Sequence, residues 1–319
     1  MNYRSLMRRS TANIELFVLL LAAVVLIVVF SILEPRFFSV NNFRILLETM
    51  SILGILSLGV NFLLIAGEMD ISFTSVLELS AAVVAISSTA HMNTFVSIAF
   101  GVLAAAAVGL INAFFAVKLK IPSFLVTLGT QVAIGGLVMI LCDYRTIIIR
   151  DKSFINVFFG RPFANIASAV YWMIGIAIVI WFVLTRTRFG KWVYATGGNQ
   201  SSARLMGIPT DRVKISLFVT SAILAGIAGF ILGSRATSAR PAMGTSYLMP
   251  AISAPILAGA ALTGGQGSAF KTLLAAFVLT IITNGVTLIG LEPAYRDIFM
   301  GVILISALSV RYLQNMNRD

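Results

Sequence analysis

The chain has 319 residues, of which 59% are hydrophobic and 11% are charged, and its mean hydropathy is +0.98. A soluble domain carries about 25% charged residues, so this chain lacks the polar residues to cover itself with a wetted surface. The net charge is +11, and the basic residues lie in loops beside apolar segments. This pattern favours membrane lipid over nucleic acid as a partner.

The residues that build common catalytic and metal sites are scarce. One cysteine, Cys142, excludes an intramolecular disulfide and a cysteine metal cage, and one histidine, His91, argues against a histidine metal site. The sequence contains no GxxxxGK[ST], HExxH or GxSxG motif. We therefore expect no metal, no cofactor and no catalytic residues, and any energy from ATP must come through a partner.

Ten apolar segments follow one another along the chain. They cover residues 14–33, 45–66, 73–89, 95–117, 124–141, 166–184, 215–233, 250–262, 270–288 and 298–313. Most have the ~17–25 residues that a helix needs to cross a hydrocarbon core of ~30 Å. Helices are required because the alternation of barrel strands is absent. The sequence predicts an all-α integral membrane protein with about ten transmembrane helices. The eighth segment, with Pro250, Pro255 and Gly259, is expected to be broken or re-entrant.

The segments predict one transmembrane domain, residues 14–313, between a cytoplasmic amino-terminal tail, 1–13, and a short carboxy-terminal tail, 314–319. Arginines before the first segment resemble a signal peptide, but the segment is about 20 residues long and lacks a small-residue cleavage site, which favours a retained span. Ten spans place both termini on the same side. With that side inside, fourteen of the 23 Lys and Arg residues lie inside and nine outside, in agreement with the positive-inside rule.

Several of the outside charges cluster in two loops, residues 142–164 and 234–248. The clustered residues are Arg145, Arg150, Lys152, Arg161, Arg235 and Arg240. One interpretation is a docking surface for an acidic soluble partner. The other is ordinary solvated loop charge, and the sequence does not separate the two.

A basic loop on the predicted inner side, residues 185–214, contains the string GGNQSSARLMGIP. It predicts a miniature helix, with Asn199 as N-cap, residues 200–206 as about two turns, Gly207 just after the helix and Pro209 as stop. A helix of ~10 Å is marginal alone in water, so we expect a soluble partner to hold it.

Acidic residues interrupt the apolar pattern at GEMDIS, residues 67–72. One interpretation is a helix break in which Asp70 caps the next segment, with Ser72 as the second candidate. The other is a hydrated gate formed by Glu68 and Asp70, since each carboxylate needs a partner or water, with Ser72 as a further candidate gate residue. Glu78, eight residues after Asp70, is expected to extend the same polar stripe.

Other polar residues within the spans are candidates to line a path for a hydroxylated solute. They are Asn61, Asn112, Thr130, Gln131 and Asn284; bonds between helices are the alternative role. The string LTGGQGS from Leu262 is expected to form a tight Gly-rich turn at the membrane face. Glycines at three- and four-residue steps, Gly226, Gly229 and Gly233, predict close helix packing.

The strings at 67–72, 121–130, 185–208 and 262–272 resemble bacterial ATP-binding-cassette importer permeases of the ribose, xylose, arabinose, allose and autoinducer-2 type, in the branched-chain-type permease family. The resemblance covers about residues 34–310. It implies a multi-pass permease of the bacterial inner membrane that pairs with a second permease copy or a paralogue. It also implies a cytoplasmic ATPase subunit and a periplasmic solute-binding protein as partners.

The family's segment GGNxxAARLxGI is the coupling helix that docks in a cleft of the ATPase. The matching residues here are Gly197, Gly198, Asn199, Ala203, Arg204, Leu205, Gly207 and Ile208. Ser202 stands where the family usually has Ala. Glu68 and Met69 replace the commoner Gly and Ile, and Phe73-Thr74 replace Val-Gly. The latter departures fall at the predicted gate and therefore bear on the substrate class.

The sequence thus predicts the permease subunit of an ATP-driven importer that translocates a sugar or sugar-like solute. The alternative is a proton-coupled secondary transporter or facilitator, with Glu68 and Asp70 as the coupling groups. A membrane scaffold without transport is a third interpretation, against which the polar breaks in the spans argue.

Overall fold

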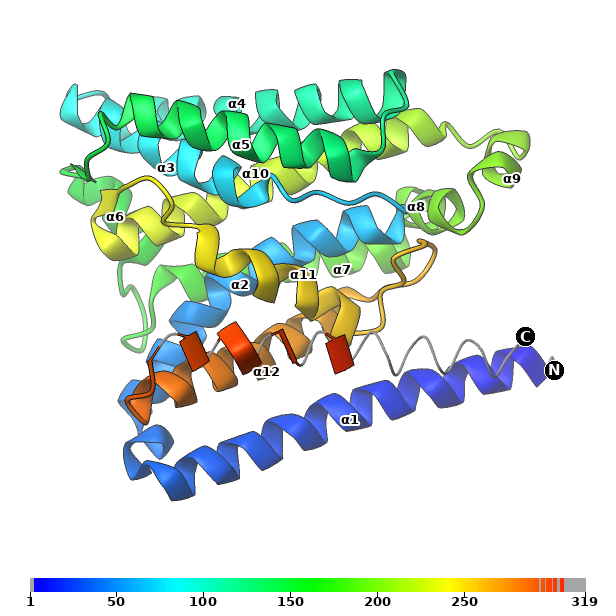
Figure 1. The fold of residues 1–319 in the computed structure, drawn as a ribbon, viewed down its shortest axis with the longest axis horizontal. Coiled ribbons are helices and arrows are strands. Elements are labelled where there is room, and N and C mark those ends of the chain that lie inside the picture. Colours follow the sequence, from blue (N-terminus) through cyan, green and yellow to red (C-terminus); the bar gives the residue numbers. More distant parts are fainter. Residues whose placement is uncertain (1–2, 293, 296, 300, 303–304, 307–319) are drawn as a thin grey trace.

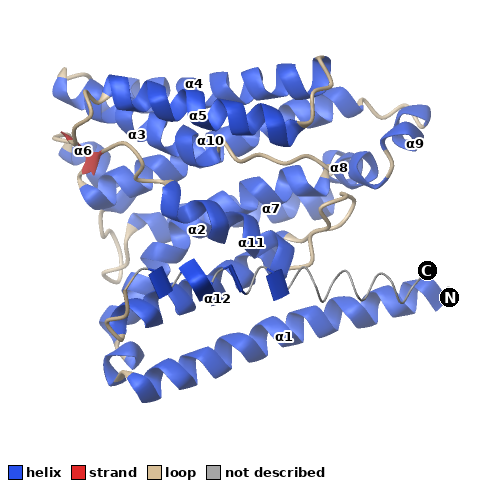
Figure 2. Cartoon of the chain, viewed as in Figure 1, coloured by secondary structure: helices blue, strands red, loops and turns tan. Residues whose placement is uncertain are grey.

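The computed structural model describes residues 3–292, 294–295, 297–299, 301–302 and 305–306. Helices account for nearly all of its regular structure (Figure 2). In chain order the elements are α1 (Tyr3–Leu33), η1 (Pro35–Phe38), α2 (Val40–Ile65), α3 (Phe73–Thr89), α4 (Thr94–Ala113), η2 (Phe114–Lys118), α5 (Ser123–Leu141), β1 (Ile147–Ile148), α6 (Lys152–Phe159), α7 (Ser168–Arg186), α8 (Arg188–Gly198), α9 (Gln200–Leu205), α10 (Thr210–Ala236), β2 (Ser238–Ala239), η3 (Thr245–Tyr247), α11 (Leu248–Leu257) and α12 (Ala269–Leu288).

Among the described residues, seven helices are long and apolar enough to cross a membrane: α1, α2, α4 with η2, α5, α7, α10 and α12. The shorter α3 is also apolar. This confirms the predicted all-α membrane class. The tenth predicted segment, 298–313, lies largely outside the described residues, as does the predicted tail 314–319. Helix α1 begins at Tyr3, so it continues through most of the residues predicted as an amino-terminal tail.

The long helices run side by side, with α2 and α10 inside the bundle and α1 at one edge (Figure 1). Helix α10 packs against α2, α3 and α4, and α12 packs between α1 and α2. Of the apolar window in α2, 83% is buried, against 11% for α5. Helix α2 is therefore a central element of this chain, whereas α5 leaves most of its surface free.

Small residues allow α10 to approach its neighbours closely. A Cβ on Gly229 would overlap the carbonyl oxygen of Leu77 in α3, and one on Gly109 of α4 would lie 2.8 Å from the carbonyl oxygen of Phe218. Such backbone contact between helices is what small residues permit in membrane proteins. The predicted role of the α10 glycines in packing is confirmed.

The two ends of the bundle differ. At one end α9 lies beyond the ends of α4, α5 and α10, with α8 beside it, and the start of α1 lies at this same end (Figure 1). We call it the α9 end. The opposite end carries α6 and the two-residue strands β1 and β2, which pair antiparallel with Ile147 opposite Ala239. We call it the β1–β2 end.

Two helices occur where the sequence predicted loops. Helix α8 occupies most of the predicted basic loop before Asn199, with Gly190, Val193 and Thr196 buried on one face. Helix α6 lies in the predicted loop 142–164 and begins at an Asp151 cap, whose side chain accepts bonds from the amides of Ser153 and Phe154. Both are short amphipathic helices that depend on the bundle for their apolar face.

Helix α11 has ten residues and contains Pro255. At a rise of 1.5 Å per residue it is ~15 Å long, about half of a hydrocarbon core. It follows the 3-10 helix η3 and ends at Leu257, with Ala258 as its C-cap; the next residue, Gly259, has a φ of +97°.

Candidate coupling and translocation site

The miniature helix predicted after Asn199 is present as α9. The Asn199 side chain accepts a bond from the amide of Ser202 at 2.9 Å, and Gly207 adopts a φ of +79° after the helix. The regular helix ends at Leu205, one residue before the predicted end, with Met206 as its C-cap. The local cap and stop signals therefore define this element correctly.

Helix α9 has one buried side and one exposed side. Ala203 is fully buried, while Leu205 and Met206 are 90% and 70% exposed. The Arg204 side chain turns back to the next helix, where it donates to Thr210 Oγ1 at 2.9 Å and pairs with Asp211. Two large apolar side chains thus face solvent on a rigidly capped element.

Glycines from two segments meet where α8 joins α9: Gly197 near the end of α8, and Gly264 and Gly265 in the turn before α12. A Cβ on Gly197 would overlap the carbonyl oxygen of Ile65, at the end of α2. The same oxygen accepts a bond from the amide of Gly265 at 2.8 Å, and a Cβ on Gly264 would lie 2.6 Å from the carbonyl oxygen of Gly197. We call this contact the glycine junction; it leaves no room for side chains.

The glycine junction explains the string LTGGQGS. Gly264 and Gly265 have φ values of +89° and +74°, as expected for a tight Gly-rich turn. The phenol of Tyr194 in α8 donates to the carbonyl oxygen of Gly267 at 2.9 Å. Burial raises the pKa of the Tyr194 phenol, so it stays protonated and available as a donor at neutral pH.

Glu68 forms a buried ion pair that ties GEMDIS to α9. Its carboxylate lies 2.6 Å from Lys214 Nζ, with side chains 12% and 11% exposed respectively. Lys214 also donates to Gln200 Oε1 of α9 at 2.9 Å. The sequence predicted Lys214 only as one of the charges of the basic loop 185–214, because its partner lies 146 residues away.

The prediction that Asp70 caps the next helix was wrong in its position. Helix α3 begins at Phe73, and Ser72 occupies the N-cap position without a side-chain cap bond. Asp70 instead accepts bonds from the amide of Ser72 at 2.7 Å and from its hydroxyl at 2.6 Å. The carboxylate therefore holds the turn that precedes the helix.

The hydroxyl of Ser72 continues a chain of polar contacts. It accepts from Asn112 Nδ2 of α4 at 2.8 Å, and Asn112 Oδ1 accepts from the Thr130 hydroxyl of α5 at 2.7 Å. We call Asp70, Ser72, Asn112 and Thr130 the polar chain. It joins the segment between α2 and α3, residues 66–72, to α4 and α5 within the bundle; we call this segment the α2–α3 link.

Helix α5 also supplies hydrogen-bond acceptors to the extended link. The amide of Met69 donates to Ser123 Oγ at 3.1 Å, and the amide of Ile71 donates to Thr127 Oγ1 at 3.2 Å. Ser123 and Thr127 lie four residues apart and so share one helix face. Gln131, one turn further, reaches Thr74 Oγ1 at 3.5 Å. Ser123 and Thr127 were not among the predicted site residues, although both lie in the string at 121–130, IPSFLVTLGT.

The other predicted path residues lie apart from the polar chain. Asn284 Nδ2 donates to Asn42 Oδ1 at 2.9 Å near the start of α2. Asn61, fully buried near the other end of α2, has no hydrogen-bond partner among the described residues. Nineteen residues of helix separate Asn42 from Asn61, which is ~28 Å. The candidate gate residues therefore do not form one cluster.

Glu78 does not extend a stripe from Asp70, because Asp70 precedes the helix and the helical spacing does not apply. The Glu78 carboxylate accepts bonds from the amides of Ala242 at 3.2 Å and Gly244 at 3.0 Å. It thus holds the loop that follows α10, 164 residues away along the chain. This contact could not be derived from local spacing.

The β1–β2 pairing brings the two basic loops together at one end. Some of their charged side chains are engaged: Arg161 pairs with Glu48 of α2 at 3.0 Å, and Arg235 donates to the adjacent Thr49 at 3.1 Å. Arg145 lies 3.6 Å from Asp143, with both side chains 82% exposed. The backbone amide of Arg150 donates to Ser88 Oγ, Lys152 begins α6, and Arg240 lies within electrostatic reach of Glu78.

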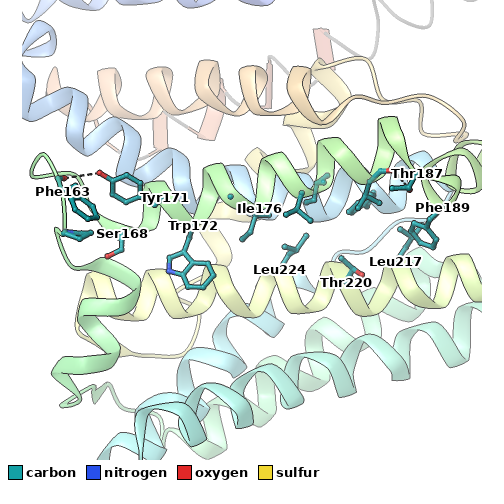
Figure 3. Close-up of a pocket in the computed structure, with 16 residues that line it drawn as sticks. Phe163, Ser168, Tyr171, Trp172, Ile176, Thr187, Phe189, Leu217, Thr220 and Leu224 are labelled. Atoms are coloured by element: carbon teal, nitrogen blue, oxygen red, sulfur yellow. Dashed lines mark hydrogen bonds between the residues drawn. The ribbon is translucent and has the colours of Figure 1, made fainter.

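A large groove runs between α7 and α10, with a volume of about 1070 Å³ (Figure 3). Its lining is mainly apolar and aromatic, with Tyr171 and Trp172 toward one end and Phe189 toward the other. Tyr171 donates to the carbonyl oxygen of Phe163 at 3.2 Å. A hydroxylated solute would find few hydrogen-bond partners here, so the polar chain is the better candidate for a path.

The fold and site define a multi-pass helical membrane protein with polar contacts inside the bundle and an exposed capped helix at one end. Residues 42–308 match the family described as "Branched-chain amino acid transport system / permease component". The chain belongs to this permease family.

Individual relatives match almost along their whole length. The ribose import permease protein RbsC of Escherichia coli K12 is 31% identical over 296 residues, which are 91% of this chain and 92% of the relative. RbsC of Haemophilus influenzae is 30% identical, with 97% of this chain and 98% of the relative covered. The L-arabinose transport system permease protein AraH of E. coli K12 is 31% identical, with 94% and 92% covered.

Proposed function

We propose that this protein is the membrane-spanning subunit of an ATP-driven importer in the bacterial inner membrane, and that it translocates a sugar or sugar-like solute. The family description mentions branched-chain amino acids, whereas the relatives named above are ribose and L-arabinose permeases. The near-complete coverage by those relatives favours a sugar. A periplasmic binding protein would deliver the solute, and a cytoplasmic ATPase subunit would supply the energy.

The observation that carries the proposal is the exposed apolar side of α9. Leu205 and Met206 project into solvent from a helix that is capped at Asn199 and anchored by Ala203 and Arg204. A rigid apolar projection of this kind is suited to insertion into a pocket of a partner protein. We assign that partner as the ATPase, with Gly197, Gly198, Gly207 and Ile208 shaping the surrounding turns.

The proposed topology has ten spans with both termini in the cytoplasm and a broken eighth segment. The α9 end then faces the cytoplasm and the β1–β2 end faces the periplasm. The length of α11, about half of a membrane, supports the broken segment. The start of α1 at the α9 end supports an inside amino terminus (Figure 1).

A second permease copy or paralogue would pack against α5. Cβ atoms added at Gly129, Gly135 and Gly136 would meet nothing within 4 Å among the described residues, and only 11% of the α5 window is buried. Small residues on an uncovered membrane helix permit close packing of another helix. Thr130 and Gln131 on α5 would place polar groups beside the resulting path.

The proton-coupled alternative assigned Glu68 and Asp70 as carriers of protons. Glu68 is held by Lys214, and Asp70 accepts two bonds from Ser72. Both carboxylates therefore have partners that hold them in place without any role in proton transport.

Uptake by proteoliposomes tests the proposal. The purified permease is reconstituted with its ATPase subunit and binding protein, and radiolabelled ribose, L-arabinose and leucine are supplied separately. We expect uptake of a sugar, and we expect this uptake to require ATP on the side of the membrane that carries the ATPase subunit. Uptake that follows an imposed proton gradient and ignores ATP would contradict the proposal, and uptake of leucine alone would contradict the substrate class.

A further inference from the structure

Lys214, in the first turns of α10, links α9 to the α2–α3 link, a segment far away in the sequence. Its ammonium group donates to Gln200 of α9 and pairs with Glu68 of the α2–α3 link. The other polar anchor of α9, Arg204, binds Thr210 and Asp211, only six and seven residues away. Arg204 therefore fixes α9 locally, whereas Lys214 reaches across 146 residues.

The contact at Glu68 continues into the bundle. Met69, the next residue, donates its amide to Ser123 of α5. Two residues after Glu68, Asp70 begins the polar chain. A displacement of Glu68 must therefore move the residues that bind α4 and α5, unless these bonds break.

The ion pair is too well buried to break easily. Both side chains are nearly nine-tenths buried, and removal of one partner would leave an uncompensated charge at low exposure. A cavity of about 370 Å³ lies beside the pair, between α9 and the turn before α5, and Lys120 and Ser123 line its far side. The contacts from Gln200 through Lys214 to Glu68 thus lie at the edge of a cavity into which α9 has space to move.

We propose that Lys214 is a positioning residue that couples movement of α9 to the α2–α3 link and hence to the polar chain. The inference rests on the proposed function, because it deepens the role of α9 in an ATP-driven importer. Lys214 itself contacts neither solute nor nucleotide. It acts by keeping Gln200 and Glu68 at fixed positions relative to each other.

The test compares solute uptake with ATP hydrolysis in the reconstituted permease–ATPase complex with its binding protein. We expect Lys214→Met and Glu68→Gln to keep the ATPase bound while uptake per ATP falls about tenfold, within the roughly 5–150-fold range of coupling between sites. The swap Glu68→Lys with Lys214→Glu should restore most of the ratio. Gln200 can turn its amide so that its NH₂ donates to the new carboxylate.

Arg36→Gln, at the pair with Glu34 in which the arginine side chain is 86% exposed, is the matched control and should leave the ratio unchanged. If uptake and hydrolysis fall together in Lys214→Met, in proportion to the amount of folded protein, Lys214 has a structural role only and the inference is overturned. Failure of the swap to restore the ratio, while the swapped protein remains folded and bound to the ATPase, would overturn it as well.

A second measurement does not depend on the ATPase. Spin labels at positions 201 and 125 report the distance between α9 and α5 in the full-length permease. We expect Lys214→Met to broaden this distance distribution and Arg36→Gln to leave it unchanged. An unchanged distribution in Lys214→Met would overturn the inference, whereas absence of ATP-dependent uptake in the unmodified complex would instead contradict the proposed function.

Discussion

At the scale of single residues, the α9 end combines two opposite requirements. In the proposed complex Leu205 must be exposed to contact the ATPase, whereas Gly197 must have no side chain, because the backbone of Ile65 occupies that space. The first requirement concerns binding and the second concerns folding. Substitutions at the two positions should therefore be separable by experiment.

Leu205→Asp should weaken the association with the ATPase without unfolding the permease. The side chain is 90% exposed, and surface substitutions usually change stability by within about 0.5 kcal/mol. Loss of a buried leucine contact in the complex costs about 1.5–3 kcal/mol, or roughly 10- to 150-fold in Kd. Co-purification and ATP-dependent uptake measure the effect, with Leu205→Met as the conservative control. Normal association of the Leu205→Asp variant with the ATPase would show that α9 is not part of the interface.

Gly197→Ala should destabilise the protein, because the new methyl group would overlap the Ile65 carbonyl oxygen. Insertion of a methyl group into such a contact costs about 1–3 kcal/mol. Gly198→Ala is the matched control, since a Cβ there meets nothing within 4 Å among the described residues. Thermal unfolding in detergent should give a lower Tm for the first variant only. Equal Tm values would mean that the glycine junction can relax.

At the scale of elements, the α2–α3 link shows how a segment without regular structure is held inside a membrane bundle. Hydrocarbon offers no partner for backbone amides, so irregular backbone must be satisfied by protein groups. Here the hydroxyls of α5 take that role at Met69 and Ile71. Ser123 and Thr127 are four residues apart on one face of α5. Their hydroxyls therefore meet Met69 and Ile71, which are two residues apart in the extended link.

Thr127→Val should therefore destabilise the link while preserving the shape of the side chain. The amide of Ile71 would lose its acceptor, at a cost of about 1–3 kcal/mol for an unsatisfied buried donor. We expect a lower Tm and reduced uptake. Thr185→Val, which removes an exposed hydroxyl from the end of α7, is the control. A Tm for Thr127→Val that equals that of the control would show that the link does not depend on this bond.

At the scale of the whole molecule, the structure separates two charged ends joined by a buried helix, α2. Its last carbonyl oxygen lies in the glycine junction, and Glu48 and Thr49 in its first half bind arginines from the opposite end. The basic residues of the β1–β2 end therefore divide into those that hold α2 and those that remain exposed.

Charge reversal should distinguish these two sets. Arg145→Glu is expected to weaken stimulation of ATP hydrolysis by the binding protein and to leave the Tm unchanged, since the side chain is 82% exposed. Arg161→Glu is expected to lower the Tm, because it would place a carboxylate beside the buried Glu48. Unchanged stimulation in Arg145→Glu would leave that residue with orientation charge only.

Local signals in the sequence were sufficient for the class of protein, for α9 with its Asn199 cap, and for the Gly-rich turn at Gly264. Each depends on residues within a few positions of one another. Contacts between residues far apart in the sequence could not be predicted. Lys214 pairs with Glu68, and Glu78 accepts a bond from Gly244, only when the helices have packed. Helix α8 was missed because its polar composition resembles a loop, and the bundle supplies the surface on which it folds.

The hydrogen bonds of the α2–α3 link affect how quickly its backbone amide protons exchange with water. The amides of Glu68, Met69, Ile71 and Ser72 are all bonded, to a carbonyl oxygen, to two hydroxyls and to a carboxylate. Side chains thus do for this stretch what a neighbouring strand does in a sheet. Its amide protons should exchange with solvent as slowly as those of the helices around it, and should become accessible only when α5 moves away.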